Sequence, residues 1–200
     1  MKRLFDLLVS GAGLLVFAPI AALIAAAIKL EDGGPVFFVQ ERVGKDCRVF
    51  PAFKFRSMIV DAEKHTGAIQ AAADDPRVTR VGRLLRATAF DELPQLWNIL
   101  RGDMSIVGPR PLRPGESDTT VAGMMLPLSA IPGYEARHRV RPGLTGVAQV
   151  YARRDLPRTW KFRYDLLYIR RAGLWLDLKL ILQSFWITVR GRWEHRGPKL

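Results

Sequence analysis

Arg86-Ala-Thr-Ala-Phe-Asp-Glu-Leu-Pro-Gln-Leu-Trp-Asn-Ile-Leu100 is the stretch around which the rest of the chain is organised. The apolar residues of its second half recur at the spacing of one helix face, and they are Leu93, Leu96, Trp97 and Leu100. Pro94 fits a helix only in the first turn, where its missing N–H leaves no hydrogen bond unmade. The pattern therefore predicts a helix that begins at or near Asp91.

Asp91 and Glu92 then place two adjacent carboxylates at a helix start, where the helix dipole favours anions. The simplest interpretation is that acids are good first-turn residues. The neighbouring sequence argues for more, because arginines precede the pair and the Gly/Pro-constrained stretch 102–111 follows it. A carboxylate pair in such surroundings is typical of a site for a phosphate group and a divalent cation.

The composition limits the domain size and the kinds of partner that we expect. The 200 residues carry a formal net charge of +12 and are 48% hydrophobic, which fits one domain of ordinary size with a sizeable core. The excess positive charge calls for a polyanionic partner: nucleic acid, an anionic membrane surface or a phosphorylated substrate. The three histidines are scattered without zinc-site spacing, and a single cysteine excludes an intrachain disulfide.

Residues 7–28 form an uncharged apolar run that is long enough to reach across a bilayer core. A cleaved signal peptide is one alternative, because alanines cluster at positions 25–27, although the run is long for such a peptide. Basic residues flank both ends, which favours both flanks on the cytoplasmic side and hence a re-entrant helix bent at Pro19. A single span kinked at Pro19 is the competing topology, and the residues alone leave the two open.

Residues 36–39 and 49–55 read as two short strands joined by a turn at 44–46. On the second strand Lys54 and Arg56 point to the face opposite Phe53 and Phe55. These two cations either bind a ligand or belong to a solvated sheet edge. The segment 61–75 is polar and alanine-rich and reads as a short helix and a surface loop. The segment 112–132 contains several breakers and reads as an excursion around the site.

Residues 160–169 predict an amphipathic, basic helix, and residues 174–189 a strongly apolar one. Aromatic residues mixed with Lys and Arg are typical of helices that lie at a membrane interface. The apolar segment is short for a membrane span, and a buried core helix is the alternative interpretation.

A series of motifs runs along nearly the whole chain: Gly34-Pro-Val-Phe-Phe38, Gln40-Glu-Arg-Val-Gly44, Lys54-Phe-Arg-Ser-Met58, Phe90-Asp-Glu-Leu-Pro-Gln-Leu-Trp-Asn98, Gly102-Asp-Met-Ser105, Gly108-Pro-Arg-Pro111, Arg141-Pro-Gly-Leu-Thr-Gly146 and Tyr164-Asp165. In this order they resemble the bacterial sugar transferases, and more narrowly the small monotopic phosphoglycosyl transferases. So many motifs in one order are far more specific than any one of them.

This resemblance implies an α+β, mostly helical monotopic membrane protein of the bacterial inner membrane. Residues 1–29 would form a re-entrant membrane helix. Residues 30–200 would form a catalytic domain on the cytoplasmic face, with a short β-hairpin and amphipathic interface helices. The break is Ala18-Pro19 here, where a Ser-Pro pair is common in the family.

The resemblance also implies an activity. Such enzymes transfer a phosphosugar from a UDP-sugar to polyprenyl (undecaprenyl) phosphate through a covalent aspartyl-phosphosugar, and they release UMP. This is the first membrane step of glycoconjugate biosynthesis. Carried over to this sequence, Asp91 is the nucleophile and Glu92 a ligand of Mg²⁺. Asp165 matches a family acid that assists the metal or orients an arginine.

Several cations are candidates to bind the substrate phosphates, and Arg86, which lies five residues before Asp91 as in the family motif, is the first of them. We expect Arg86 and the helix start to favour the ionised form of Asp91. The further candidates are Lys54, Arg56, Arg110 and Arg141.

The expected partners are a UDP-sugar, polyprenyl phosphate and membrane lipid, with no nucleic acid; the oligomeric state stays open. A non-enzymatic membrane-anchored binder of anionic lipid or nucleic acid is the competing hypothesis. It accounts for the net charge but gives no reason for paired acids among arginines.

Overall fold

The computed structural model describes residues 1–62, 64, 75–119, 125–153 and 156–193. The helices are α1 (Lys2–Asp32), α2 (Arg80–Thr88), α3 (Gln95–Arg101), α4 (Tyr134–Arg137), α5 (Val147–Tyr151), α6 (Arg158–Arg171) and α7 (Leu174–Val189). The strands are β1 (Phe37–Val43), β2 (Val49–Phe55), β3 (Ser105–Val107), β4 (Ser117–Thr119), β5 (Met125–Pro127) and β6 (Gly143–Thr145), with 3₁₀ turns η1 (Lys45–Cys47), η2 (Phe90–Glu92) and η3 (Leu128–Ala130). The predicted α+β class is confirmed.

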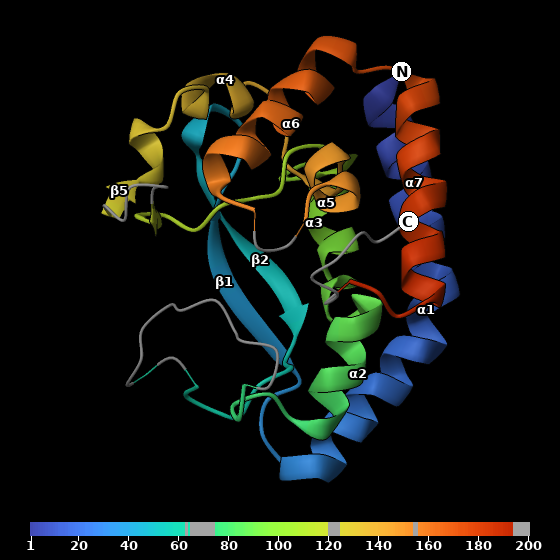
Figure 1. Ribbon diagram of the computed structural model, residues 1–200. Coiled ribbons are helices and arrows are strands. Elements are labelled where there is room, and N and C mark those ends of the chain that lie inside the picture. Colours follow the sequence, from blue (N-terminus) through green and yellow to red (C-terminus); the bar gives the residue numbers. More distant parts are fainter. Residues whose placement is uncertain (63, 65–74, 120–124, 154–155, 194–200) are drawn as a thin grey trace.

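The β1–β2 hairpin crosses the middle of the molecule, with α2 and α3 beside it and the long helices α1 and α7 along one edge (Figure 1). The two strands pair antiparallel from Phe37 opposite Phe55 to Val43 opposite Val49. Both predicted strands are therefore present, and the first extends further along the chain than expected. The segment 112–132 contains the small β4–β5 hairpin and η3, whereas most of 61–75 lies outside the described residues.

α1 runs without interruption through Pro19 and bends along its course (Figure 1). It ends at Gly33, whose φ of 72° is the left-handed conformation that glycine adopts readily at a helix C-terminus. Among the described residues it is the one helix that is long and apolar enough to cross a membrane, judged by length and composition. Only 11% of the most apolar 18-residue stretch of this helix is buried within the protein.

The first turns of α1 are fixed to the body of the protein. The ammonium group of Lys2 pairs with Asp177 of α7 at 2.6 Å, and Arg3 donates to the last carbonyls of α3. Asp6 is buried and accepts hydrogen bonds of 3.0 Å from the Ser105 hydroxyl and from the next backbone N–H of β3. Lys2 and Arg3 are therefore paired within the protein, although the sequence pattern alone would assign their charges to a membrane flank.

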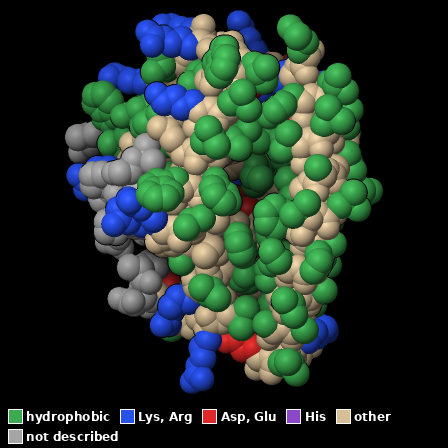
Figure 2. All heavy atoms as spheres, turned by 90° about the vertical axis from the view of Figure 1, so that its right-hand side faces the viewer, with side chains coloured by type: hydrophobic (Ala, Val, Ile, Leu, Met, Phe, Trp, Pro, Cys, Tyr) green, Lys and Arg blue, Asp and Glu red, His purple; other side chains and the backbone are tan. Residues whose placement is uncertain are grey.

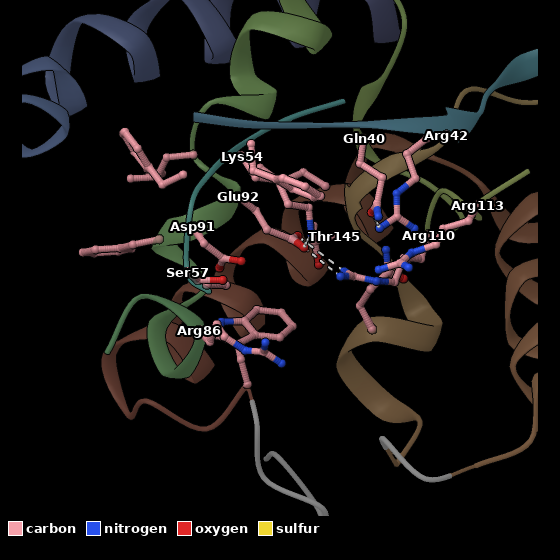
Figure 3. A pocket seen from close by; sticks show the side chains of 18 of the residues that line it. Gln40, Arg42, Lys54, Ser57, Arg86, Asp91, Glu92, Arg110, Arg113 and Thr145 are labelled. Atoms are coloured by element: carbon pink, nitrogen blue, oxygen red, sulfur yellow. Dashed lines mark hydrogen bonds and ion pairs between the residues drawn. The ribbon is translucent and has the colours of Figure 1, made fainter. Parts of the chain in front are cut away.

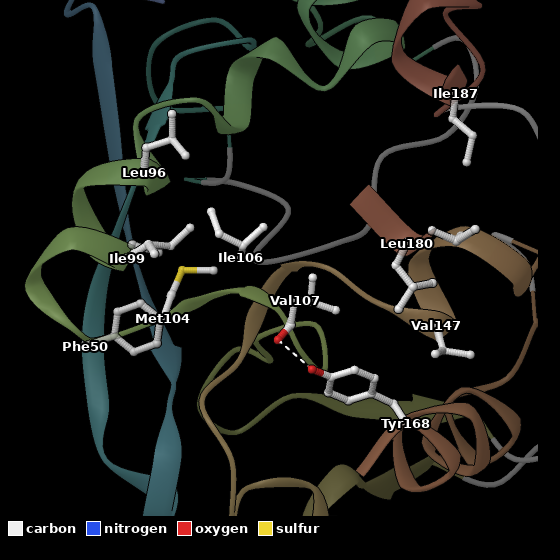
Figure 4. Packing of buried hydrophobic residues seen from close by; sticks show 12 residues of the cluster. Phe50, Leu96, Ile99, Met104, Ile106, Val107, Val147, Tyr168, Leu180 and Ile187 are labelled. Atoms are coloured by element: carbon white, nitrogen blue, oxygen red, sulfur yellow. Dashed lines mark hydrogen bonds between the residues drawn. The ribbon is translucent and has the colours of Figure 1, made fainter. Parts of the chain in front are cut away.

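The main core lies between α3, β3, α5, α6 and α7 (Figure 4). Its apolar members include Ile99, Met104, Val107 and Leu180. Tyr168 brings a polar group into it: its hydroxyl lies 3.1 Å from the Val107 carbonyl oxygen and 2.8 Å from a carboxylate oxygen of Asp177, and these two acceptors share its single proton. Because buried polar groups stabilise only when they are paired, this hydroxyl fixes α6 against β3 and α7 together.

α1 and α7 expose a broad apolar face (Figure 2). Its large side chains include Leu8, Leu15, Val16 and Leu23 of α1 and Trp175, Leu182, Phe185 and Val189 of α7. In α7 only Asp177, Leu180 and Ile187 are buried, so the alternative of a buried core helix for residues 174–189 is wrong. An apolar face of this extent marks a surface that meets lipid or another apolar partner.

Asn98 ties the central stretch to the hairpin, and it is fully buried. Its side-chain oxygen accepts from the backbone N–H of Phe53 at 3.0 Å, and its NH₂ group donates to the Pro51 carbonyl at 2.7 Å and to Asp103 at 3.1 Å. One side chain thus holds α3 on β2.

We expect Asn98→Ala to destabilise the fold by about 3 kcal/mol, because it leaves buried backbone groups unpaired. Thermal unfolding in detergent measures the change. Arg101→Ala is the matched control on the same helix: its ion pair with Asp103, at 3.5 Å, is exposed, so the expected loss is below about 1 kcal/mol. Equal losses from the two variants would contradict the role given to Asn98.

Candidate active site

Two glycine motifs far apart in sequence form the frame of the site. β3 and β6 pair in parallel and bring the loop after β3 against the segment before β6. A Cβ atom on Gly143 would lie 2.0 Å from the backbone nitrogen of Gly108, and one on Gly108 would lie 2.5 Å from the Arg141 carbonyl oxygen. Because only glycine allows this approach, the two motifs fit backbone to backbone and fix the loop that carries Arg110.

Asp91 and Glu92 stand on η2, a short turn between α2 and α3. Ala89 ends α2 with a φ of 57°, which is uncommon for a residue with a side chain, and redirects the chain into this turn. Pro94 is the N-cap of α3, which begins at Gln95. The predicted helix start at Asp91 is therefore wrong: the left-handed Ala89 creates a separate turn, and the acids precede α3.

The Glu92 carboxylate is held by two cations (Figure 3). Its Oε1 lies 2.6 Å from the ammonium group of Lys54 and 2.7 Å from the Arg110 guanidinium. Burial alone would raise the pKa of Glu92, but the charges and hydrogen bonds of Arg110 and Lys54 outweigh it and hold the pKa far below its usual range. Glu92 is therefore an anion at any physiological pH.

The Asp91 carboxylate is in the opposite situation. Within the described part of the chain it makes no hydrogen bond or ion pair, although it lines the same cavity as Glu92. Burial raises its pKa to about 6, opposed by the charge of Lys54 and reinforced by that of Glu92. Arg86 does lower the pKa of Asp91, as expected, but burial and the charge of Glu92 outweigh the cations, so the pKa of Asp91 is raised and not lowered.

The structure brings together most of the predicted site residues. Lys54, Arg86, Asp91, Glu92 and Arg110 all line one cavity of about 860 Å³ (Figure 3). Burial lowers the pKa of Arg86, and the charge of Asp91 opposes this effect. The cluster therefore offers a row of cations around two acids, as a phosphate site requires.

Two of the cations predicted to bind phosphate, Arg56 and Arg141, have other partners in the structure. The guanidinium group of Arg56 lines the cavity but pairs with Asp32 at the end of α1, and it is buried. Arg141 donates from Nε to the Gly102 carbonyl at 2.8 Å and is not among the residues that line the cavity. Arg141 thus supports the loop after α3, and nothing in its position brings it to the two acids.

Asp165 lines the cavity and is also linked to Arg110 through a second residue. Its carboxylate lies 2.9 Å from the Arg137 guanidinium, both side chains are almost fully buried, and Arg137 donates to the Arg110 carbonyl at 2.7 Å. Of the two roles expected for Asp165, the geometry supports orienting an arginine. Arg137 was not predicted, because its place in the short helix α4 carries no motif.

Further residues that were not predicted line the cavity: Gln40, Arg42, Arg113 and Thr145 (Figure 3). Arg42 donates to the Pro111 carbonyl at 3.1 Å and to the Gln40 side chain. The signal was present, since residues 40 and 42 alternate along β1 and alternate residues of a strand share a face.

The two carboxylates are the groups of this site that could hold a divalent cation. The described residues hold no group of three or more His, Cys, Asp or Glu side chains that would form a closed metal site. Mg²⁺ usually binds through one or two carboxylates together with substrate phosphates and water. Oε1 of Glu92 already accepts two short hydrogen bonds. Among the described residues Oε2 has only Arg110 Nη1 at 3.4 Å, so Oε2 and the neighbouring Asp91 remain as oxygen donors.

Comparisons with known proteins agree with the motifs. Residues 1–191 match the family described as bacterial sugar transferase. The undecaprenyl-phosphate glucose phosphotransferase of Komagataeibacter xylinus is 49% identical over 90% of this chain and 34% of its own length. The UDP-glucose:undecaprenyl-phosphate glucose-1-phosphate transferase of Klebsiella pneumoniae is 45% identical over 90% of this chain and 38% of its own. This chain thus spans little more than a third of these two relatives.

A third relative has nearly the same length. The exopolysaccharide production protein PSS of Rhizobium leguminosarum bv. phaseoli is 43% identical over 90% of this chain and 91% of its own length. The matched region therefore corresponds to a unit that also occurs almost by itself.

Proposed function

The chain belongs to the bacterial sugar transferase family, and from this premise we propose that it transfers a sugar phosphate from a UDP-sugar to undecaprenyl phosphate. The proposed reaction proceeds through a covalent intermediate on Asp91 and releases UMP. It would supply the first lipid-linked sugar of a glycoconjugate such as an exopolysaccharide.

The observation that carries this proposal is the contrast between two neighbouring carboxylates. Glu92 is fixed by Lys54 and Arg110, whereas Asp91 lines the same cavity and has no hydrogen-bond or ion-pair partner among the described residues. A carboxylate nucleophile attacks most readily when no ion pair holds its oxygens and when groups close by neutralise the phosphate it attacks. Asp91 meets both conditions.

In the first half-reaction a carboxylate oxygen of Asp91 attacks the sugar-bearing phosphorus of the UDP-sugar. The new P–O bond forms as the bond to the bridging oxygen breaks, and that oxygen leaves on UMP. In the second half-reaction a phosphate oxygen of the acceptor attacks the same phosphorus, and the Asp91 carboxylate is the leaving group. Lys54, Arg86 and Arg110 neutralise the phosphate oxygens in both steps.

Glu92, through its less engaged Oε2, would hold Mg²⁺ together with donor phosphate oxygens. When bound, the ion supplies additional positive charge at the transferring phosphate.

Release of UMP from a panel of UDP-sugars, with Mg²⁺ and undecaprenyl phosphate present, tests this function. UDP-glucose is the first donor to try, because several relatives are named for it. We expect one or a few donors to give UMP and a glycolipid. Binding of anionic vesicles without UMP from any donor would instead support the non-enzymatic binder.

We also propose that the protein is monotopic, in the inner membrane with its site on the cytoplasmic face. Both ends of α1 support this, because each is fixed to the same body. Lys2 pairs with Asp177, and at the other end Glu31 accepts from the backbone N–H of Arg80 at 2.7 Å. A helix fixed at both ends to one domain enters and leaves the bilayer on the side of that domain.

This topology predicts equal accessibility of the two flanks of α1. A cysteine inserted directly after Met1 and a separate Lys45→Cys variant, each in a Cys47→Ser background, should react alike with a membrane-impermeant thiol reagent in inside-out vesicles and stay protected in intact spheroplasts. The background change is needed because Cys47 is exposed. Opposite labelling of the two positions would show a true span and contradict the re-entrant helix.

The pKa of Asp91 predicts a pH dependence. Only the ionised carboxylate attacks phosphorus, and burial raises its pKa to about 6. We therefore expect kcat/KM to be constant near pH 8 and to fall about tenfold per pH unit well below pH 6. A profile measured with UDP-glucose or the best donor, and still flat at pH 5, would contradict Asp91 as the titrating nucleophile.

A further inference from the structure

The lining of the candidate-site cavity is of two chemical kinds. Lys54, Arg86 and Arg110 line it together with the two acids. The lining residues that come from α1 and α7 are uncharged: Phe17 of α1 and Ile181, Ser184, Phe185 and Thr188 of α7. A cavity lined both by cations and by the uncharged side chains of two helices is complementary to a ligand with a phosphate at one end and a hydrocarbon chain at the other.

The uncharged lining adjoins the exposed face of α1 and α7. Figure 2 shows this face hollowed, with acidic side-chain atoms visible inside the hollow. Phe185 is 65% exposed and also lines the cavity, so it stands at the mouth. The apolar side chains around the mouth belong to the surface that we propose meets the lipid.

From this geometry we infer that the isoprenoid chain of the acceptor enters between α1 and α7, with Phe17, Ile181 and Phe185 as the walls of the passage. The inference rests on the proposed function. Ser184, which is hydrogen-bonded to Thr145, lies on the α7 side of the passage. The chain therefore stays in the membrane while the phosphate reaches the cations beside Asp91.

The size of the cavity bears on whether the donor and the acceptor phosphate bind together or in turn. A volume of about 860 Å³ is that of one small-molecule site. Donor and acceptor phosphate would then occupy the cationic part of the cavity in turn, in keeping with two half-reactions. An obstacle in the passage should impair the second half-reaction and spare the first.

A reversible chemical modification can block the passage after the protein has folded. The test then does not depend on whether a variant with a bulky side chain folds. Ser184→Cys in the Cys47→Ser background is modified, after folding, with a benzyl thiosulfonate, and the disulfide is later removed with a reductant. We expect the modified protein to keep the UMP burst from the donor alone and to lose at least about tenfold in glycolipid formation. Reduction should restore the rate.

Leu182→Cys, modified in the same way, is the matched control, because Leu182 lies on the same helix, is 69% exposed and does not line the site cavity. Glycolipid formation that survives modification at Ser184, or an equal loss at Leu182, would overturn the passage. Equal loss of burst and glycolipid at Ser184 would also overturn it, since the position would then serve the whole site.

The proposed covalent mechanism is judged separately, by whether the unmodified protein gives a UMP burst at all. Without a burst, the passage is still tested by the KM for undecaprenyl phosphate in steady state, which should rise on modification while the KM for the donor stays constant. An unchanged acceptor KM would contradict the passage in that case too.

Discussion

Asp91→Asn should reduce turnover by at least about 10³-fold, which is the scale seen when a catalytic nucleophile is removed. Asparagine keeps the size and shape of the side chain but has no carboxylate to attack phosphorus. Because the Asp91 carboxylate makes no hydrogen bond or ion pair within the described residues, the substitution breaks no contact that holds the fold. UMP release with the preferred donor measures the effect, and an unchanged melting temperature shows that the loss is chemical.

Asp46→Asn is the control for this experiment. Asp46 lies in the hairpin turn with a φ of 55°, a conformation that asparagine adopts readily, and it is exposed. This variant should retain the wild-type rate. An Asp91→Asn protein with more than about a tenth of wild-type turnover would remove Asp91 from the role of nucleophile.

Glu92→Gln should reduce turnover by about 10²- to 10³-fold, the range found when a charge-stabilising group is removed from an active site. The change leaves Lys54 and Arg110 without their shared carboxylate at 2.6 and 2.7 Å. It also removes the oxygen donor proposed for Mg²⁺, so the Mg²⁺ concentration that gives half-maximal rate should rise.

A second readout separates this role from simple damage to the site. The charge of Glu92 raises the pKa of Asp91, so its removal should lower that pKa and move the acid limb of the kcat/KM profile below pH 6. A merely disrupted site would lose rate without this displacement. An unchanged Mg²⁺ requirement together with an unmoved acid limb would contradict the role proposed for Glu92.

Local pattern predicted much of the fold. Alternating residues predicted the β1–β2 hairpin, and helical periodicity predicted α6 and α7. It failed at the start of α3, where Pro94 was expected in the first turn and is instead the N-cap. The left-handed Ala89 puts a separate turn before α3, and alanine gives no sequence signal for that conformation.

The candidate residues that share the cavity were found from the sequence where they belong to a recognisable motif, and they were missed where only tertiary contacts bring them there. Asp91, Glu92 and Arg110 come from recognisable motifs and meet in one cavity. Arg137 has no motif: its importance lies in a buried pair with Asp165 that the packing of α4 on α6 creates. Arg141 has a motif, but there the glycine and not the arginine is what the β3–β6 contact requires.

The central claim is that the sugar phosphate is carried on Asp91. The most direct test uses a donor labelled in the sugar, without any acceptor lipid. The unaltered protein should retain the label through denaturation and lose it to hydroxylamine, as an acyl phosphate does, while Asp91→Asn should retain none. Glycolipid formed at the normal rate by a protein that never retains label would instead mean that undecaprenyl phosphate attacks the donor directly, and it would contradict the covalent account.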